Sequence, residues 1–308
     1  MLPRREPAAL VRFAAKASLT VAVLLTLAKL AAALASDSLA ILASLVDSLA
    51  DIGGSLITFL AVRVSQQPPD RSHRFGHGKA ESLSALAQAC LVLGSALFVL
   101  IGAGDRLLSP KAIEAGTFAL LVLAAAIAVT LALVTLQGWV VRRTGSAAIA
   151  ADRLHYTADL ATNLLVLAAL LLTVRLDITW LDPLAGALVA AYLAWQAGRL
   201  GRSAIDTLMD RELDPEERRR IELLVRAHPD VFDLHDLRTR RAGSTTFIEL
   251  HVEIDGAMSV RRAHHVTDAL EARLAEAFGE TEIIIHQEPA GLEDDRLDHR
   301  IADLGTGP

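Results

Sequence analysis

Two pairs of potential metal ligands occur with the same spacing in apolar stretches of the chain. Asp47 and Asp51 lie four residues apart, and His155 and Asp159 repeat that spacing in a later stretch. On a helix, residues four apart share one face. A charged side chain at the bilayer centre costs about 2.5–3.5 kcal/mol on insertion scales, so each pair needs a partner. Two such helices could enclose one cation, although either pair alone could instead hydrogen-bond to neighbouring helices.

The donor chemistry of these four residues narrows the choice of cation. Together they offer three carboxylates and one imidazole. That set suits tetrahedral Zn²⁺. Cd²⁺ or Fe²⁺ could use the same donors, because nitrogen and oxygen ligands discriminate weakly between such metals. The spacing and the donor set therefore predict an intramembrane site for a divalent cation, with Zn²⁺ as the first choice.

A second group of potential ligands lies in the polar segment that follows the first pair. Asp70, His73 and His77 form the pattern D-x2-H-x3-H. Three such ligands could bind a metal ion whose coordination is completed by water or another group. From the spacing alone, a solvated loop that happens to contain histidines explains the pattern equally well.

The last third of the chain is acidic and rich in histidine. Residues 1–209 hold 17 basic and 13 acidic side chains, whereas residues 210–308 hold 13 and 23, together with seven of the ten histidines. Such a segment does not suit nucleic acid, which requires a basic face. It does suit divalent cations. Cys90 is the single cysteine of the sequence, so neither disulfides nor a thiolate zinc site can form the framework.

Six apolar stretches are long enough to span a bilayer, which requires about 20 residues each. The first could be a cleaved signal peptide, because Ala33 and Ala35 resemble a cleavage site. Lys29 and a polar start of 16 residues favour a membrane helix instead. Basic residues gather in alternate loops, so both termini are predicted to be cytoplasmic. The expected spans are 13–33, 39–64, 82–104, 115–141, 147–174 and 183–205.

After residue 210 the pattern changes to that of a small domain outside the bilayer. Amphipathic periodicity predicts two helices, and alternating polarity predicts three strands. The order α-β-β-α-β indicates an α+β domain with an open sheet on two helices. We therefore expect a six-helix, all-α membrane domain over 1–209, an α+β cytoplasmic domain over 210–290 and a disordered tail over 291–308. The predicted elements of the second domain are 214–227, 231–240, 246–254, 259–278 and 282–286.

Four long motifs resemble the cation diffusion facilitator family, in particular its bacterial zinc and ferrous-iron efflux antiporters. They are SLVDSLADIGGSL, QPPDRSHRFGHGKAESL, DRLHYTADLATN and IIIHQEP. The resemblance covers the chain from about residue 12 to Pro289. It implies that Asp47, Asp51, His155 and Asp159 form the transport site. It also implies a second metal at Asp70, His73 and His77.

The resemblance further implies a binuclear site in the cytoplasmic domain and a salt bridge at the domain junction. The position of Glu288 is usually Asp in the family, and the extra methylene could shift a bridging carboxylate or reduce the site to one ion. By spacing alone, single histidines of this kind are more often surface residues. Gln287 is expected beside the ligands, and Lys79 is expected to pair with Asp210. The implied ligands are His235, His251, His264, His286 and Glu288.

The function expected from these residues is export of Zn²⁺, or of Cd²⁺ or Fe²⁺, in exchange for protons. The protein would be a homodimeric, multi-pass antiporter of the cytoplasmic (inner) membrane. An intramembrane metallohydrolase would need a motif such as H-E-x-x-H, which the sequence lacks, so no enzyme is expected. A metal sensor, or a channel without proton coupling, remains the alternative.

Overall fold

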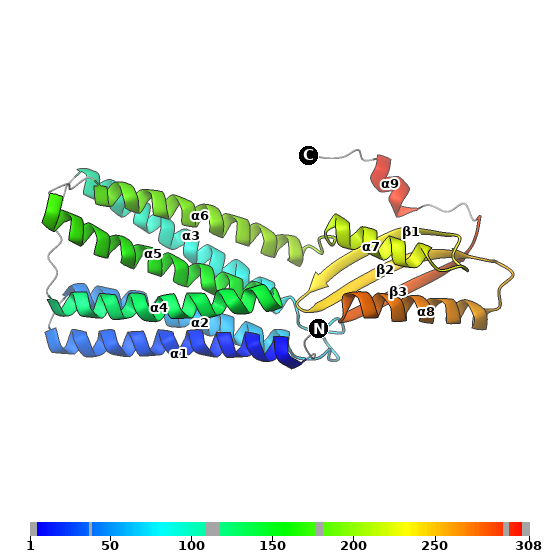
Figure 1. Cartoon of the computed structure of the whole chain (residues 1–308), viewed down its shortest axis with the longest axis horizontal. Coiled ribbons are helices and arrows are strands. Elements are labelled where there is room, and N and C mark those ends of the chain that lie inside the picture. Colours follow the sequence, from blue (N-terminus) through cyan, green and yellow to red (C-terminus); the bar gives the residue numbers. More distant parts are fainter. Residues whose placement is uncertain (1–4, 37–38, 109–116, 177–180, 292–295, 304–308) are drawn as a thin grey trace. The chain divides into compact units, whose positions relative to one another are not determined.

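The computed structural model describes the chain except for residues 1–4, 37–38, 109–116, 177–180, 292–295 and 304–308. The chain divides into two compact units, Met1–Ile205 and Asp206–Pro308. Figure 1 shows a bundle of long helices in the first unit and a sheet with helices in the second. Each unit is described separately below.

The first unit is a bundle of six long helices, as the sequence predicted. Each helix has 27 to 32 residues, which at 1.5 Å per residue exceeds the roughly 30 Å of a bilayer's hydrocarbon core. Within the described residues, three stretches are long and apolar enough to cross a membrane: Pro7–Ala28, Ala80–Asp105 and Leu123–Thr144. The helices are α1 (Arg5–Ser36), α2 (Leu39–Ser65), α3 (Ala80–Leu108), α4 (Thr117–Thr144), α5 (Ala147–Leu176) and α6 (Leu181–Leu208).

Many of the buried residues of this bundle are alanines, and many of its large apolar side chains face outward. Ala14, Ala85 and Ala151 are completely buried, whereas Phe98 is 80% exposed and Leu188 is 66% exposed. This inverted distribution suits a bilayer, where small residues let helix backbones approach closely and apolar side chains contact lipid. The α5 helix packs against α2, α3 and α4, and α2 packs against α1 and α3.

The second unit is a three-stranded sheet with order β1-β2-β3. β1 and β2 run antiparallel, and β2 and β3 run parallel. Apolar side chains of β2, such as Ile248 and Leu250, join Ile221 of α7 and Leu270 of α8 in one core. The elements are α7 (Pro215–Arg226), β1 (Asp233–Ala242), β2 (Thr245–Ile254), α8 (Val260–Phe278), β3 (Thr281–Pro289) and α9 (Leu297–Asp303).

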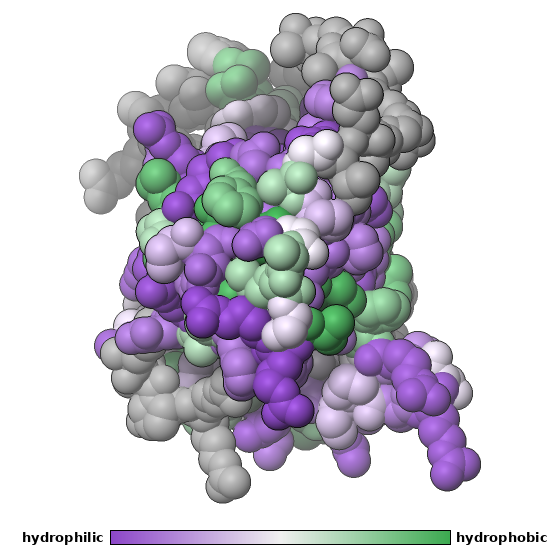
Figure 2. Space-filling view, turned by 90° about the vertical axis from the view of Figure 1, so that its right-hand side faces the viewer, coloured by the Kyte–Doolittle hydropathy of each residue, from purple (hydrophilic) through white to green (hydrophobic). Residues whose placement is uncertain are grey.

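Local sequence signals account for the helix ends of this unit. Pro215 occupies the start of α7, where its missing N–H is not needed. The Ser259 side chain accepts a hydrogen bond from the backbone N–H of Arg262 and so caps α8. Gly279 ends α8 with a φ of 82°, a conformation that glycine adopts without a steric penalty. Hydrophilic side chains dominate the face in Figure 2, which looks onto this unit, as befits a domain outside the bilayer.

One expectation about the chain end does not hold. We expected disorder throughout 291–308, but Leu297–Asp303 forms the short helix α9. Its N-terminus is held by Asp236 of β1, whose carboxylate accepts hydrogen bonds from the backbone N–H groups of Leu297 and Asp298 at 3.0 Å each. The partner lies about sixty residues away in the chain, so the local sequence carries no signal for this contact.

Candidate functional site

The structure brings three of the four predicted membrane ligands together. His155 Nε2 on α5 lies 3.1 Å from Asp51 Oδ1 on α2 and 3.7 Å from Asp159 Oδ2, one turn further along α5. A tetrahedral zinc ion with bonds near 2.0 Å separates its ligand atoms by about 3.3 Å, so the spacing fits such an ion. His155 is buried and Asp159 is partly exposed. Asp47 lies one turn before Asp51 on α2, and its side chain falls outside the described residues.

Hydrogen bonds between helices hold the two ligand-bearing helices in place. The hydroxyl of Tyr156, next to His155, bonds to the Ser55 hydroxyl of α2 at 2.7 Å and donates to the Ser18 carbonyl of α1 at 3.2 Å. Gln88 of α3 donates to the Gly54 carbonyl of α2 at 2.8 Å. Near Asp51 and His155, α2 and α5 are therefore hydrogen-bonded to each other and to two neighbouring helices, α1 and α3.

A buried carboxylate that had no assigned role in the sequence lies one turn before His155. Asp152 is fully buried and accepts a hydrogen bond at 2.8 Å from Gln137 of α4, which also donates to Ser18 of α1. The position of Asp152 inside a predicted span was a signal in the sequence, because polar residues inside such spans usually bind neighbouring helices or mark function. Its hydrogen-bond partner could be identified only from the packing of the helices.

The three predicted loop ligands also lie together, between α2 and α3. Asp70 Oδ1 is 3.4 Å from His73 Nδ1, and Asp70 Oδ2 is 3.4 Å from His77 Nε2. The backbone N–H groups of His73 and Ser72 donate to Asp70 and hold the pKa of its carboxyl below the usual value. The carboxylate therefore stays ionised and available to a cation. His73 and Asp70 are exposed, so this group lies at the surface.

The register of the cytoplasmic sheet places three histidines side by side. His235 of β1 is opposite His251 of β2, and His251 is opposite His286 of β3. Glu288 Oε2 lies 3.1 Å from His235 Nε2, while its other oxygen lies 2.9 Å from His251 Nδ1 and 3.4 Å from His286 Nε2. Ligand atoms of His235, His251 and Glu288 all lie within 4.8 Å of one another. Glu288 thus reaches both sides of the group despite its extra methylene.

Two residues expected near this group have other contacts. His264 is exposed on α8, and its Nε2 is 3.7 Å from Asp268; it is not among the three residues whose ligand atoms cluster. Gln287 donates a hydrogen bond at 3.2 Å to Thr267 of α8. Since Thr267 belongs to α8, this bond places the Gln287 side chain on the helix-covered face of the sheet. Successive strand residues point to opposite faces.

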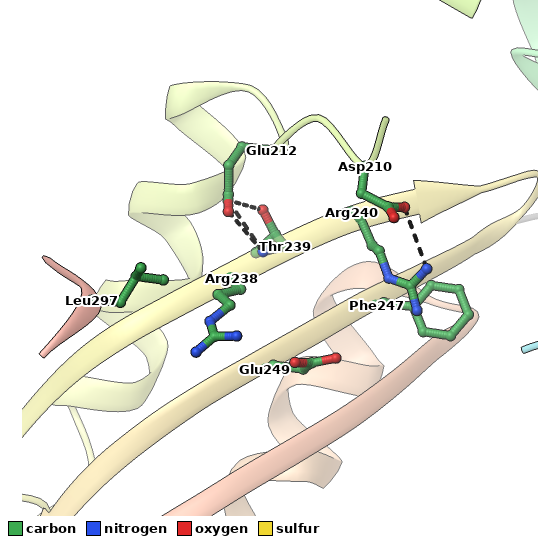
Figure 3. A pocket seen from close by; sticks show the side chains of 8 residues that line it. All are labelled: Asp210, Glu212, Arg238, Thr239, Arg240, Phe247, Glu249 and Leu297. Atoms are coloured by element: carbon green, nitrogen blue, oxygen red, sulfur yellow. Dashed lines mark hydrogen bonds and ion pairs between the residues drawn. The ribbon is translucent and has the colours of Figure 1, made fainter. Parts of the chain in front are cut away.

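The predicted junction residue Asp210 has a partner within its own unit. The Asp210 carboxylate lies 3.3 Å from the Arg240 guanidinium. Figure 3 shows this pair in a pocket that Glu212 and Thr239 also line. The Arg240 guanidinium lies 4.3 Å from the centre of the Phe247 ring. Pairing of Asp210 with Lys79 would join the two separately described units and stays a prediction.

Comparisons with known proteins identify relatives along almost the whole chain. Two family models match, the cation efflux transmembrane domain over residues 15–209 and the cation efflux protein, cytoplasmic domain, over residues 213–290. The cation-efflux pump FieF of Shewanella oneidensis is 46% identical over 283 residues, which cover 92% of this chain and 95% of that protein. The cation-efflux pump FieF of Pectobacterium carotovorum is 44% identical over 282 residues, which cover 92% and 94%.

A likeness to a solved structure is more limited. The metal-bound C-terminal domain of the CzcD transporter from Thermotoga maritima shares 32% sequence identity, with a TM-score of 0.25, over 26% of this chain and 93% of that one.

The family matches bear directly on the predictions of fold and class. They confirm a helical transmembrane domain, with six helices before residue 210, followed by an α+β cytoplasmic domain. They also confirm that the protein is a transporter and not an enzyme. The chain belongs to the cation diffusion facilitator family and is a multi-pass cation efflux protein of the FieF type.

Proposed function

We propose that this protein exports a divalent metal ion, Zn²⁺ in the first place, from the cytoplasm in exchange for protons. The observation that carries the proposal is the group formed by His155, Asp51 and Asp159 between two helices of the membrane domain, with spacings of 3.1 and 3.7 Å. Such residues inside a membrane domain mark ion pathways and proton relays. Asp47, one turn from Asp51, would complete the set of four ligands.

Coupling to protons follows from the chemistry of the ligands. A carboxylate or imidazole binds a metal ion only after it has lost its proton, so metal and protons compete for the same atoms. When the site faces the cytoplasm, the carboxylates and the neutral imidazole bind the metal ion. When it faces a more acidic side, protons displace the ion and return with the site. Alternating access would require α2 and α5 to move together relative to their neighbours.

We assign the other two groups of candidate metal ligands, in the loop and in the cytoplasmic unit, a role in regulation rather than in transport. Asp70 and His73 are exposed and His77 is partly exposed, in the loop that joins α2 to α3, so we assign a metal ion there no part in crossing the bilayer. The group at His235, His251 and Glu288 lies in the cytoplasmic unit, with His264 and His286 as further proposed ligands. The family model over residues 213–290 is designated ZT_dimer, which supports a homodimer. Light scattering should then give twice the chain mass of 32.9 kDa.

The transport site is tested by isosteric substitutions in proteoliposomes with an imposed pH gradient. Asp51→Asn and Asp159→Asn keep the side-chain shape but remove the charge, so zinc uptake should fall by at least tenfold. Asp105→Ala is the matched control, because Asp105 is an exposed acid on α3 outside the group. Wild-type uptake in both Asn variants would refute the site.

A second measurement distinguishes an antiporter from a channel or a sensor. In sealed vesicles that enclose a pH-sensitive dye, an antiporter moves protons whenever a zinc gradient is applied. Zinc flux without proton movement would indicate a channel, and the absence of both would indicate a sensor. Competition between Zn²⁺, Cd²⁺ and Fe²⁺ at the membrane site, with the other two sites removed, identifies the preferred metal.

A further inference from the structure

The C-terminal segment docks beside the cytoplasmic histidines. Arg296 Nη2 donates to Glu253 Oε1 of β2 at 2.5 Å, and its Nη1 lies 3.9 Å from Asp233 of β1. The backbone N–H of Asp236 donates to Asp298 at 2.9 Å, while the Asp236 carboxylate accepts from α9 in return. These N–H groups hold the pKa of Asp236 below its usual value, although burial alone would raise it. The segment is therefore anchored at both Glu253 and Asp236.

This anchoring involves residues beyond the family's cytoplasmic domain. The matching family model ends at residue 290, whereas the described contacts come from Arg296, Leu297 and Asp298. The segment thus adds contacts that belong to this chain's own terminus. The site that it adjoins is the one at His235, His251 and Glu288.

Both ring nitrogens of His235 lie near carboxylates. Nε2 is 3.1 Å from Glu288 Oε2, on the side where the other ligand atoms gather, and Nδ1 is 3.8 Å from Glu253 Oε1. His235 is only 4% exposed. The donor separations of 2.9 to 3.4 Å around Glu288 fit the roughly 3.3 Å between ligands of a tetrahedral zinc ion. A metal ion on Nε2 would leave the Nδ1–H group facing Glu253.

The carboxylate oxygen that faces His235 is the same one that Arg296 holds. A metal-binding histidine normally donates its second N–H to a carboxylate, a carbonyl or water, which orients the ring and raises its basicity. At 3.8 Å, Glu253 Oε1 is beyond the 2.7–3.2 Å typical of N–H···O hydrogen bonds. Its 2.5 Å contact with Arg296 fixes it there. The Arg296 guanidinium and the Nδ1 atom of His235 thus face the same carboxylate oxygen, and Arg296 is the nearer of the two.

We propose that Arg296 is a positioning residue that lowers the metal affinity of the cytoplasmic site by holding Glu253 away from His235. The inference rests on the proposed function, since it assumes that this site binds a divalent cation. Release of Arg296 allows Glu253 Oε1 to move to Nδ1, while Oε2 still accepts a hydrogen bond from the Gly291 N–H group at 3.4 Å, and this strengthens His235 as a ligand. The C-terminal segment therefore sets the concentration at which the cytoplasmic unit loads with metal.

The test measures zinc affinity of the full chain in detergent by competition with a chromophoric chelator. Asp51→Ala and Asp70→Ala are present throughout, so that only the cytoplasmic site binds strongly. Arg296→Ala should tighten binding by about tenfold, the lower end of the range for residues that support a metal ligand. Arg296→Lys retains the positive charge and should restore the original affinity. A chain ending at Gly291 should behave like Arg296→Ala.

Loss of a positive charge could by itself strengthen the binding of a cation. Two controls therefore test whether the effect of Arg296 on zinc affinity depends on Glu253. Arg226→Ala removes a charge that pairs with Asp233 at 2.6 Å, and it should leave the affinity close to the original value. In a Glu253→Ala background, Arg296→Ala should have no further effect. An equal effect of Arg296→Ala in both backgrounds would refute the positioning role.

The outcomes also separate this inference from the proposed site itself. If His235→Ala does not weaken zinc binding, the cytoplasmic site is wrongly placed and both proposals about it fail. If His235→Ala weakens binding but Arg296→Ala and the shortened chain do not tighten it, only the role of Arg296 is refuted. Thermal unfolding without metal checks that each variant remains folded.

Discussion

At the residue scale, Glu288 is the side chain on which the cytoplasmic group depends. Its two oxygens lie within 3.4 Å of nitrogens from His235, His251 and His286, which come from three different strands. An aspartate is shorter by one methylene, so glutamate must reach the group with a different side-chain conformation. Glu288 makes these contacts while it is only partly exposed.

Replacing Glu288 should remove metal from the cytoplasmic unit alone. Glu288→Ala leaves three imidazoles without the carboxylate that joins them, and we expect the full chain to lose at least one equivalent of bound zinc. Elemental analysis after dialysis measures the stoichiometry. Glu282→Ala, an exposed position on the same strand, is the control. Undiminished stoichiometry in Glu288→Ala would mean that the group does not bind metal.

The groups of candidate ligands were easier to predict than the residues that surround them. The types, spacing and apolar surroundings of Asp51, His155 and Asp159 predicted a group that the structure brings together, and D-x2-H-x3-H did the same for the loop group. Glu253 and Arg296 could not, because their contact depends on where the C-terminal segment folds back. Tyr156 was also missed, since its partners Ser18 and Ser55 lie on other helices.

At the element scale, α2 and α3 approach closely where α2 carries two consecutive glycines. A Cβ atom on Gly54 would lie 3.2 Å from the Gln88 amide nitrogen, whereas one on Gly53 would have nothing within 4 Å. Gln88 donates to the Gly54 carbonyl and, at 3.1 Å, to Thr58 of α2. The absence of a side chain at Gly54 thus allows an interhelical hydrogen bond one turn from Asp51.

The two glycines should respond differently to the same substitution. Gly53→Ala should stabilise the protein by up to about 1 kcal/mol, because alanine favours a helix over glycine. Gly54→Ala should lose this gain and destabilise by about 1 kcal/mol, since Gln88 must move and its hydrogen bonds weaken. Thermal unfolding of purified protein compares them. A stabilised Gly54→Ala variant would show that the close approach is unimportant.

The strands show where prediction from sequence reaches its limit at this scale. Alternating polarity located β1 and β2 to within two residues, but register depends on pairing and cannot be read from one strand. The irregularity between His235 and Arg238 was not foreseen. Asp236 lies within this irregularity and has a φ of 50°. Its carboxylate accepts the hydrogen bonds from the first N–H groups of α9.

At the scale of the whole molecule, two units with opposite distributions of polarity are joined in one chain. The helical unit buries small residues and exposes large apolar ones, and the second unit has an apolar core of its own. Charge counts and hydropathy predicted this division from the sequence. The boundary between the units, after Ile205, falls within the last turn of α6, which ends at Leu208, whereas the predicted boundary followed residue 209.

Metal should therefore stabilise the two units separately. Zinc at 100 times the dissociation constant of the cytoplasmic site should add about 2.7 kcal/mol to the stability of that unit, and a chelator should reverse the effect. Hydrogen exchange of β1, β2 and β3 in the full chain, with and without zinc, measures this. Protection of the strands that persists in Glu288→Ala would place the stabilising metal elsewhere.

The parallel pairing of β2 with β3 determines the stage of synthesis at which the cytoplasmic group can form. The cytoplasmic ligands come from β1, β2 and the last strand, and α8 separates the last strand from the other two. No two strands alone can supply the complete group, so a ribosome-bound chain holds it only after Glu288 has emerged and paired. If this group binds metal as proposed, metal binding includes the free energy of closing the sheet, so the ion binds only to a domain whose three strands have paired. The proposed cytoplasmic site would then form only after all six membrane helices have been synthesised.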